Sequence, residues 1–395
     1  MIRITEAIQP YAWGSRTALQ SLFGAQEGGP AAEAWLGAHP LAPATLAGEP
    51  RTLIDVIADD CERALGRDVV ARFGTQLPYL LKVIAAEHPL SLQVHPHIHR
   101  ARAGFDEEDA AGVPRDAPHR NYRDRNHKPE LVFALTQFDA VCGFRAPRRA
   151  AELFGGLDTP LAKDLHGTLL ADPSAAGIRA VFTRLLDPDT RPTGDEVAEL
   201  AAASAARLDA GSPSPRADHT VALLHDAYPG DPGVVTSLLL NPVTLQPGEA
   251  MFVPAGGVHA YLHGVAVEIM ASSDNVLRAG LTPKHVDVPE LLRNVDYVAA
   301  PPIRVAPEVF HGATKVFYAP VDDFELSVTD LADDDEHPLP GRGPRILLCL
   351  DGEVHVATSG DGELRLARGQ AAFVPAADGR LTVHGSGRII QADVP

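Results

Sequence analysis

Gln93 and His95 are the residues whose types and spacing first suggest chemistry. They lie two positions apart in residues 91–96, and in an extended segment both side chains point to the same face. An amide oxygen and an imidazole nitrogen placed in this way could bind a metal ion. Alone, the pair is weak evidence, because Gln-x-His also occurs in ordinary strands. Two further candidate ligands, Glu130 and His259, lie in motifs farther along the chain.

Strand-like segments must position these ligands. Residues 77–86 form an apolar run that leads into the first motif. Farther on, Pro129 favours an extended backbone at Lys128, which puts Lys128 and Glu130 on one face of the chain. The polar residues between these motifs, 99–125, are expected to form a long loop.

A turn-and-strand motif that leads to His259 occurs twice. In an extended chain Tyr261, two residues later, shares the face of His259. The second copy lies 121 residues farther on, and Arg380 stands where His259 would be. The matching pairs are Gly248 and Gly369, Phe252 and Phe373, Val253 and Val374, Pro254 and Pro375, and Ala255 and Ala376. This pattern is similar to that of cupins, which are double-sheet β-barrels, so we expect one barrel with a metal ion and one without.

Length and residue pattern indicate more than one domain. The 395 residues exceed the usual size of a single core. Residues 148–225 are rich in Ala and Leu at helical spacing, whereas short apolar runs and turns surround them. We therefore predict a mainly β protein with two cupin-type (jelly-roll) barrels and an inserted small α-helical domain. The expected domains are 1–147 with 226–300 for the metal-binding barrel, 148–225 for the helices, and 301–395 for the C-terminal barrel.

Charge and cysteine content narrow the classes of function. The formal net charge is −18 without a basic stripe, so nucleic acid is not an expected partner. No apolar run is long enough for a membrane span, and the N-terminus lacks a signal pattern. The three scattered cysteines suggest neither a disulfide framework nor a Cys-type zinc site, and we expect a cytoplasmic monomer. Arginine cannot replace lysine where a compact, deprotonatable cation is required, so the few lysines of this chain are candidates for such a role. Only five of the 34 residues that are Lys or Arg are lysines, namely Lys82, Lys128, Lys163, Lys284 and Lys315.

Several motifs, in the same order, resemble the type I mannose-6-phosphate (phosphomannose) isomerases. They cover Tyr11-x-Trp13-Gly14 and residues 34–40, 91–96, 126–130, 253–261 and 273–284. The resemblance implies a zinc-dependent aldose–ketose isomerase of mannose metabolism that interconverts mannose 6-phosphate and fructose 6-phosphate. It also implies one zinc ion per chain, Arg278 as the catalytic arginine, and the metal ligands Gln93, His95, Glu130 and His259.

Such an isomerisation needs an electrophile at the carbonyl oxygen, a base near C1 and C2, and a site for the phosphate. Lys128 and Asp274 are the leading candidates for the base, with His127 and Glu268 also in suitable motifs. Another interpretation is that His127 and Asp274 orient the metal ligands. The residues expected to contact the sugar phosphate are Ser91, Tyr261 and Lys284.

The same motifs are compatible with two other functions. A non-enzymatic cupin that binds or senses a sugar would need the four metal ligands but not Lys128, Arg278 and Lys284. A cupin oxygenase that uses another metal is also compatible with the types of ligand.

Overall fold

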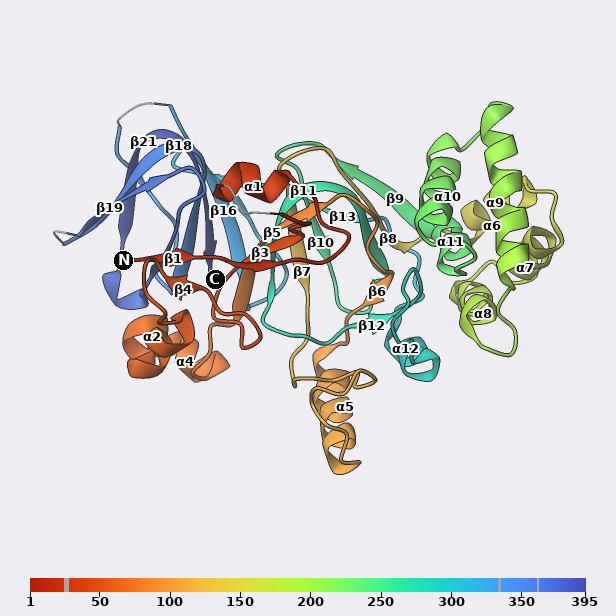
Figure 1. The fold of residues 1–395 in the computed structure, drawn as a ribbon, viewed down its shortest axis with the longest axis horizontal. Coiled ribbons are helices and arrows are strands. Elements are labelled where there is room, and N and C mark those ends of the chain that lie inside the picture. The colour runs from red at the N-terminus through yellow and green to blue at the C-terminus, as the bar shows by residue number, and fades with distance from the viewer. Residues whose placement is uncertain (25–27, 333–334, 361) are drawn as a thin grey trace.

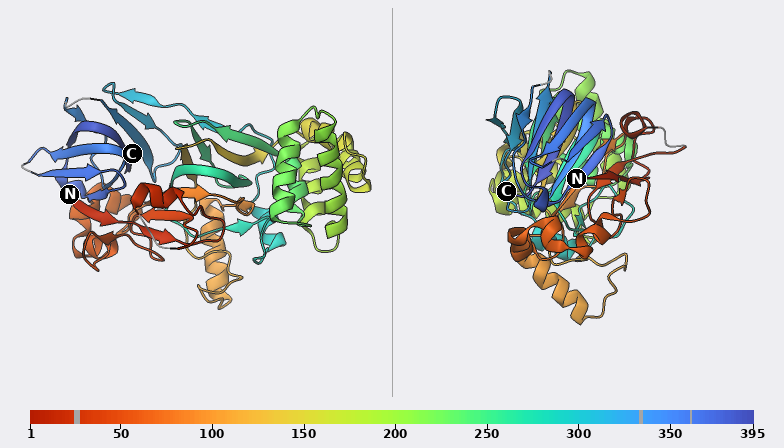
Figure 2. Two further views of the ribbon diagram at one scale, coloured as in Figure 1. Left: turned by 45° about the horizontal axis from the view of Figure 1, so that its top comes forward. Right: turned by 90° about the vertical axis from the view of Figure 1, so that its left-hand side faces the viewer.

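The computed structural model describes residues 1–24, 28–332, 335–360 and 362–395. Three parts follow one another along the long axis: a C-terminal β unit at one end, a second β unit in the middle, and a helical bundle at the other end (Figures 1 and 2). The mainly β prediction is confirmed, since the described residues form two large sheets of eleven and ten strands. Among the described residues, the strand pairings do not close either sheet into a barrel.

The central sheet carries the predicted metal ligands. Its longest strand first pairs with β6 and β8 and then with β5 and β7, so it joins the two halves of the sheet. Its strands are β2 (Ala7–Gln9), β3 (Glu33–Leu36), β5 (Tyr79–Ala86), β6 (Gln93–Val94), β7 (Glu130–Ala134), β8 (Phe138–Phe144), β9 (Leu240–Leu245), β10 (Ala250–Val253), β11 (His259–Ala271), β12 (Leu277–Arg278) and β13 (Ile303–Val305).

The C-terminal sheet packs against one face of the central sheet. Alternation along β5 and β11 turns Val83 and Val267 toward this interface, and Phe133 meets Phe317 there edge to face, with 5.3 Å between ring centroids. The strands are β1 (Ile2–Thr5), β4 (Thr45–Leu46), β14 (Glu308–Phe310), β15 (Thr314–Phe317), β16 (Glu325–Leu331), β17 (His337–Pro338), β18 (Arg345–Thr358), β19 (Glu363–Ala367), β20 (Ala371–Val374) and β21 (Leu381–Asp393).

The internal repeat corresponds to β10 and β20. Gly248 and Gly369 precede these strands with φ of +90° and +80°, a conformation that favours glycine. Both strands pair with segments that lie far away in the sequence. β10 pairs with β13, and β20 pairs with β1 at the other end of the chain. The predicted limits 1–147 and 301–395 therefore do not coincide with the strand pairings. Arg380 is exposed, and the interior of this unit is apolar.

A bundle of helices extends along the chain from Pro147 to Thr236. Thr193 begins the longest helix with a capping box to Glu196, and Val197, Leu200 and Leu224 contribute to the buried core. This core continues into residues of β6, β8 and β11, so the bundle and the central sheet share one apolar interface. Its helices are α6 (Pro147–Gly155), α7 (Pro160–Ala171), α8 (Ala175–Leu186), α9 (Gly194–Asp209), α10 (Pro215–Ala227) and α11 (Gly233–Thr236).

Residues 99–125 differ from the expected loop, because most of the first half forms α5 (Ile98–Ala110). This helix projects from the central unit and is polar over much of its surface (Figure 1). None of the helices within the described residues is long and apolar enough to cross a membrane. The remaining helical elements are α1 (Ala18–Phe23), α2 (Leu53–Asp59), α3 (Cys61–Leu65), α4 (Arg67–Phe73), α12 (Val288–Asn294), η1 (Ser237–Leu239) and η2 (Ala376–Asp378).

Candidate active site

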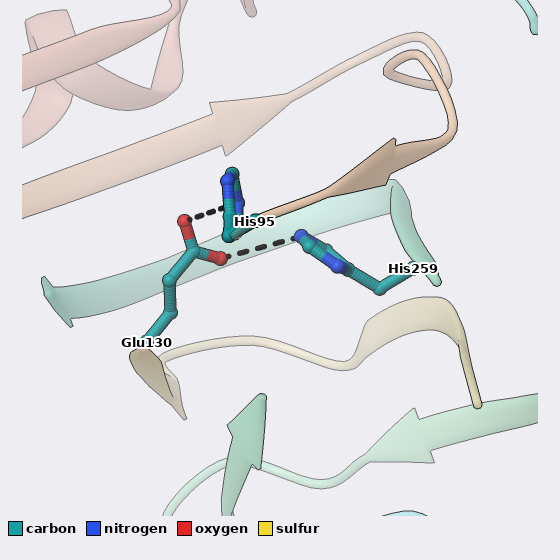
Figure 3. Close-up of side chains that lie close together, drawn as sticks. All are labelled: His95, Glu130 and His259. Carbon is teal, nitrogen blue, oxygen red and sulfur yellow. Dashed lines mark ion pairs between the residues drawn. The ribbon is translucent and has the colours of Figure 1, made fainter. Parts of the chain in front are cut away.

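Three predicted ligands from different strands meet in the interior of the central sheet. His95 follows β6, Glu130 begins β7, and His259 begins β11. The Nε2 atom of His95 lies 3.1 Å from one carboxylate oxygen of Glu130, and that of His259 lies 3.4 Å from the other (Figure 3). All three side chains are buried. The structure therefore brings together residues that are more than 160 positions apart in the sequence.

Hydrogen bonds to backbone carbonyls fix the tautomers of both imidazoles. Nδ1 of His95 donates to the Asn275 carbonyl at 2.8 Å, and Nδ1 of His259 donates to the Gly257 carbonyl at 3.0 Å. Each Nε2 therefore presents a lone pair toward Glu130, and Nε2 of His95 is buried without a hydrogen-bond partner. Burial above all, and also the nearby Lys128, lowers the pKa of His95 to about 4, which keeps its ring neutral. The lone pairs of the two Nε2 atoms and of the Glu130 carboxylate thus converge with no proton between them, an arrangement that a bound cation stabilises. Two imidazole nitrogens and a carboxylate are typical ligands of zinc.

Gln93 lies beside this group. In the sheet it pairs directly with His259 on one side and with Arg278 on the other, so all three side chains emerge on the same face. The amide nitrogen of Gln93 donates to the Ser91 hydroxyl at 3.3 Å. This bond leaves the amide oxygen of Gln93 available, as a metal ligand requires.

Five charged side chains surround the position between the histidines. Lys128 contacts Glu130 at 3.0 Å, and Lys82 lies 3.2 Å from Glu268 and 3.7 Å from Glu33. Burial opposes the charged form of Glu130, but Lys128 and the histidines outweigh it and hold the pKa of this carboxyl well below its usual range. Burial first, and then Glu130, raises the pKa of Glu268. Three carboxylates against two ammonium groups leave one excess negative charge, which favours the binding of a cation.

A cavity of about 520 Å³ opens above this charged interior. Arg278, Lys284 and Arg123 line it, and among the described residues none of these side chains has an ion-pair partner. Burial above all, and then Arg123, lowers the pKa of Arg278. The pKa of Lys284 is also lowered, first by burial and then by Arg278 and Arg123. Three mutually repelling cations that line one cavity form a site for an anion.

Asp274 also lines this cavity. Burial raises the pKa of this carboxyl, although Lys128 and Lys82 act against the shift. Nε2 of His39 lies 3.5 Å from Oδ1 of Asp274, and the backbone N–H of Leu41 donates to Nδ1 of His39 at 3.4 Å. His39 thus carries its proton on Nε2 and holds Asp274 in place.

Two predicted site residues have other contacts. Nε2 of His127 pairs with Asp323 of the C-terminal unit at 3.0 Å, because His127 points to the opposite face of the chain from Lys128. The Tyr261 hydroxyl donates to Glu130 at 3.1 Å and is buried below the metal position. The structure therefore brings Lys128, Glu268 and Tyr261 to the interior but keeps His127 away from it.

Sequence reasoning assigned no role in the site to Lys82, Glu33, Arg123 or His39. The scarcity of lysine was the one available signal for Lys82, which is 5% exposed in spite of its charge. Glu33 faces it from β3, where it also accepts a hydrogen bond from Trp35 at 2.6 Å. No local pattern marks Arg123.

Comparisons with known proteins agree with this geometry. A family profile for the phosphomannose isomerase type I catalytic domain matches residues 1–147, and one for a mannose-6-phosphate isomerase cupin domain matches residues 313–394. The mannose-6-phosphate isomerase of Escherichia coli is 42% identical over 98% of both chains, and the human one is 32% identical over 94% of this chain and 92% of its own.

Solved structures give the same result. A crystal structure of a phosphomannose isomerase mutant from Salmonella typhimurium superposes with a TM-score of 0.89 at 40% identity, covering 99% of this chain and 98% of its own. A zinc-bound mannose 6-phosphate isomerase superposes with a TM-score of 0.88 at 41% identity and with the same coverage. Matched in sequence and in fold over nearly its whole length, the chain belongs to the type I phosphomannose isomerase family.

Proposed function

We propose that the protein is a zinc-dependent mannose-6-phosphate isomerase that interconverts mannose 6-phosphate and fructose 6-phosphate. The observation that carries this proposal is the buried group of His95, Glu130 and His259, whose free lone pairs converge below a cavity with a cationic wall. Family membership and the zinc-bound relatives support the same conclusion.

The metal would be held by Gln93, His95, Glu130 and His259. When bound, zinc supplies a Lewis acid that polarises a substrate oxygen at C1 or C2. The Asn275 and Gly257 carbonyls keep both imidazole rings oriented for this task, and the Tyr261 hydroxyl supports the carboxylate. We therefore assign Tyr261 to ligand positioning rather than to direct contact with the sugar.

The phosphate is proposed to bind at Arg278, Lys284 and Arg123. These residues provide positive charge in a protein whose overall charge is −18, so they offset the long-range repulsion of an anionic substrate. Arg278 is separated from His259 by only one strand, which carries Gln93. Neighbouring strands lie about 4.8 Å apart, so the long side chain of Arg278 can also reach the reacting carbons. Ser91 lies on the same cavity wall and can donate to a sugar hydroxyl.

The reaction moves a proton between C2 of the aldose and C1 of the ketose through an enediolate. A base first removes the proton from one carbon, negative charge develops on the oxygens of the enediolate, and the proton returns to the other carbon. Lys128 and Asp274 both line the cavity and both lie close enough to influence each other's charge. We propose that one of them is this base. Glu268, which is bound to Lys82, would set the electrostatic balance beneath the metal.

A pair of isosteric variants separates the two candidates. Asp274→Asn and Lys128→Met are compared for the exchange of solvent deuterium into C2 of mannose 6-phosphate. Loss of the base abolishes exchange and turnover together, whereas loss of a residue that only binds or orients raises KM and leaves exchange measurable. The Lys128 variant also needs a zinc assay, because Lys128 contacts the ligand Glu130.

Turnover itself tests the proposal. Purified protein is given mannose 6-phosphate, and the fructose 6-phosphate formed is measured through coupled enzymes. Turnover that is abolished by a chelator and restored by zinc is expected. A protein that binds the sugar phosphate but forms no ketose would be a sensor or binding protein, and the isomerase proposal would be wrong.

We further propose that the enzyme works as a cytoplasmic monomer. Widely separated free cysteines fit a reducing compartment. Sedimentation at several concentrations would reveal a dimer, and fractionation of the producing cells would reveal another location.

A further inference from the structure

The C-terminal sheet carries a second group of metal-binding side chains, which lies outside the catalytic cavity. It consists of His355 on β18, Glu363 on β19 and His384 on β21. We propose that these residues form an exchangeable surface site for a divalent transition-metal ion such as Ni²⁺, Cu²⁺ or Zn²⁺. The site is separate from the buried zinc position, because in Figure 1 these strands lie in the end unit of the molecule and the catalytic strands lie in the middle.

Strand register brings the two imidazoles together. His355 and His384 are direct cross-strand partners, so their side chains emerge on the same face of an antiparallel ladder. Their rings are parallel to within 4°, with 5.0 Å between centroids. The positions on either side are also paired between the same two strands, so the backbone that presents the rings is part of a continuous ladder. Binding therefore costs only side-chain rotation.

Glu363 completes the group from the third strand. Its Oε1 lies 3.0 Å from Nδ1 of His355, and one ligand atom from each of the three residues lies within 4.8 Å of the others. Ligand atoms around a tetrahedral ion at about 2.0–2.1 Å would stand roughly 3.4 Å apart. Small rotations of the two rings about their χ2 angles can close this difference. Imidazole with carboxylate suits borderline divalent metals better than Ca²⁺ or Mg²⁺.

The site faces solvent. Along β18, Val354 and Val356 on either side of His355 point into the apolar interior, so His355 must point outward. Its side chain is 33% exposed and that of Glu363 is 56% exposed. An ion can therefore enter and leave freely, in contrast to the buried catalytic position.

Neighbouring charges favour a cation. Glu353 forms an ion pair with Arg365 and also approaches Nε2 of His355 at 3.7 Å. Arg365 thus pairs with Glu353, whereas Glu363 contacts His355 and is placed to bind a metal together with it. If the group is nothing more than a His–Glu ion pair that stabilises the β18–β19 hairpin, it will bind no metal.

Titration of the zinc-loaded enzyme with Ni²⁺ distinguishes these outcomes. Isothermal calorimetry should detect one additional Ni²⁺ per chain, while the zinc content stays constant. Removing a residue that hydrogen-bonds to a metal ligand typically weakens metal binding about 10–100-fold. His384→Ala removes a ligand itself, so it should weaken Ni²⁺ binding at least about tenfold. His384→Asn should behave in the same way and guards against a folding defect of the first variant.

Two controls make the result specific. His219→Ala removes an exposed histidine from α10 and should leave Ni²⁺ affinity unchanged. Isomerase activity should be the same in all these variants, because the group lies outside the cavity. The proposal is overturned if the wild type shows no saturable Ni²⁺ binding, or if both His384 variants bind Ni²⁺ as tightly as the wild type does.

Discussion

Replacing Arg278 by alanine should lower kcat by about two to three orders of magnitude. Arg278 lines the cavity, and among the described residues no carboxylate neutralises it, so its full charge is available to the substrate. Burial above all lowers its pKa, and such a desolvated cation stabilises developing negative charge strongly. Removal of one comparable donor costs about 10²–10³ in kcat, which corresponds to about 2.7–4 kcal/mol of transition-state stabilisation.

The fold should tolerate this change. Arg278 forms no ion pair with Asp274 or Glu268 in the described part of the chain, and its backbone pairing with Gln93 does not depend on the side chain. Zinc content should therefore stay near the wild-type value, and the free energy of unfolding should change by about 0.5 kcal/mol or less. Arg278→Lys should recover only part of the activity, because lysine lacks the planar guanidinium fork.

Steady-state kinetics, metal analysis and thermal unfolding are measured on the same preparations. Arg380→Ala, which removes an exposed arginine outside the cavity, serves as the matched control. A rise in KM with unchanged kcat would show that Arg278 only binds the phosphate. A joint fall of Tm, zinc content and activity would show that it holds the fold, and either result would refute a catalytic role.

Two further predictions concern the metal and the interface between the sheets. His259→Ala should lose most zinc and nearly all turnover, because it removes a metal ligand. Arg380→Ala changes the corresponding position of the second repeat and should keep both. Equal zinc loss in the two variants, measured by mass spectrometry, would contradict the interpretation of the repeat. Burial raises the pKa of Asp393 to about 7, although Arg345 acts against the shift. The native state therefore keeps a proton that the unfolded chain releases above about pH 4. Stability should consequently fall as the pH rises from about 4 to about 7. Asp393→Asn should flatten this part of the stability–pH curve in chemical unfolding, and an unchanged slope would argue against the shift.

The candidate metal ligands could be proposed from the sequence because each lies in a short motif, and the resemblance to the isomerase family combined them into one set. Extended backbone around Gln93 and His95, and the proline before Glu130, set the directions of the side chains without reference to the rest of the fold. The repeat likewise indicated that His259 has no counterpart in the second unit, since Arg380 is exposed. The mainly β class and the helical segment followed from residue spacing.

Other parts of the site depend on register between distant strands. Lys82 faces Glu268 because β5 and β11 align them directly, and Glu33 joins them from the neighbouring β3. Such a register is set by the whole sheet and leaves no mark in any single segment. Arg123 reaches the cavity from an irregular segment, which carries no periodicity at all.

Long-range pairing also explains the differences in the fold. β1 joins β20 from the opposite end of the chain, and β13 joins β10, so contiguous ranges could not describe the two β units. α5 was missed because it is polar and lacks a side-chain cap. Ion pairs of Arg100 with Glu107 and with Glu290 of α12 stabilise it instead. A local pattern cannot reveal that second partner.

The most direct test is to follow isomerase activity while zinc is returned to the stripped enzyme. Metal-free protein is prepared with a chelator, and zinc content and turnover of mannose 6-phosphate are measured on the same samples. Activity should rise in proportion to zinc until one ion is bound per chain, and it should stay constant when more zinc is added. Full activity without zinc, or activity that requires a second zinc ion, would contradict a single buried centre at His95, Glu130 and His259.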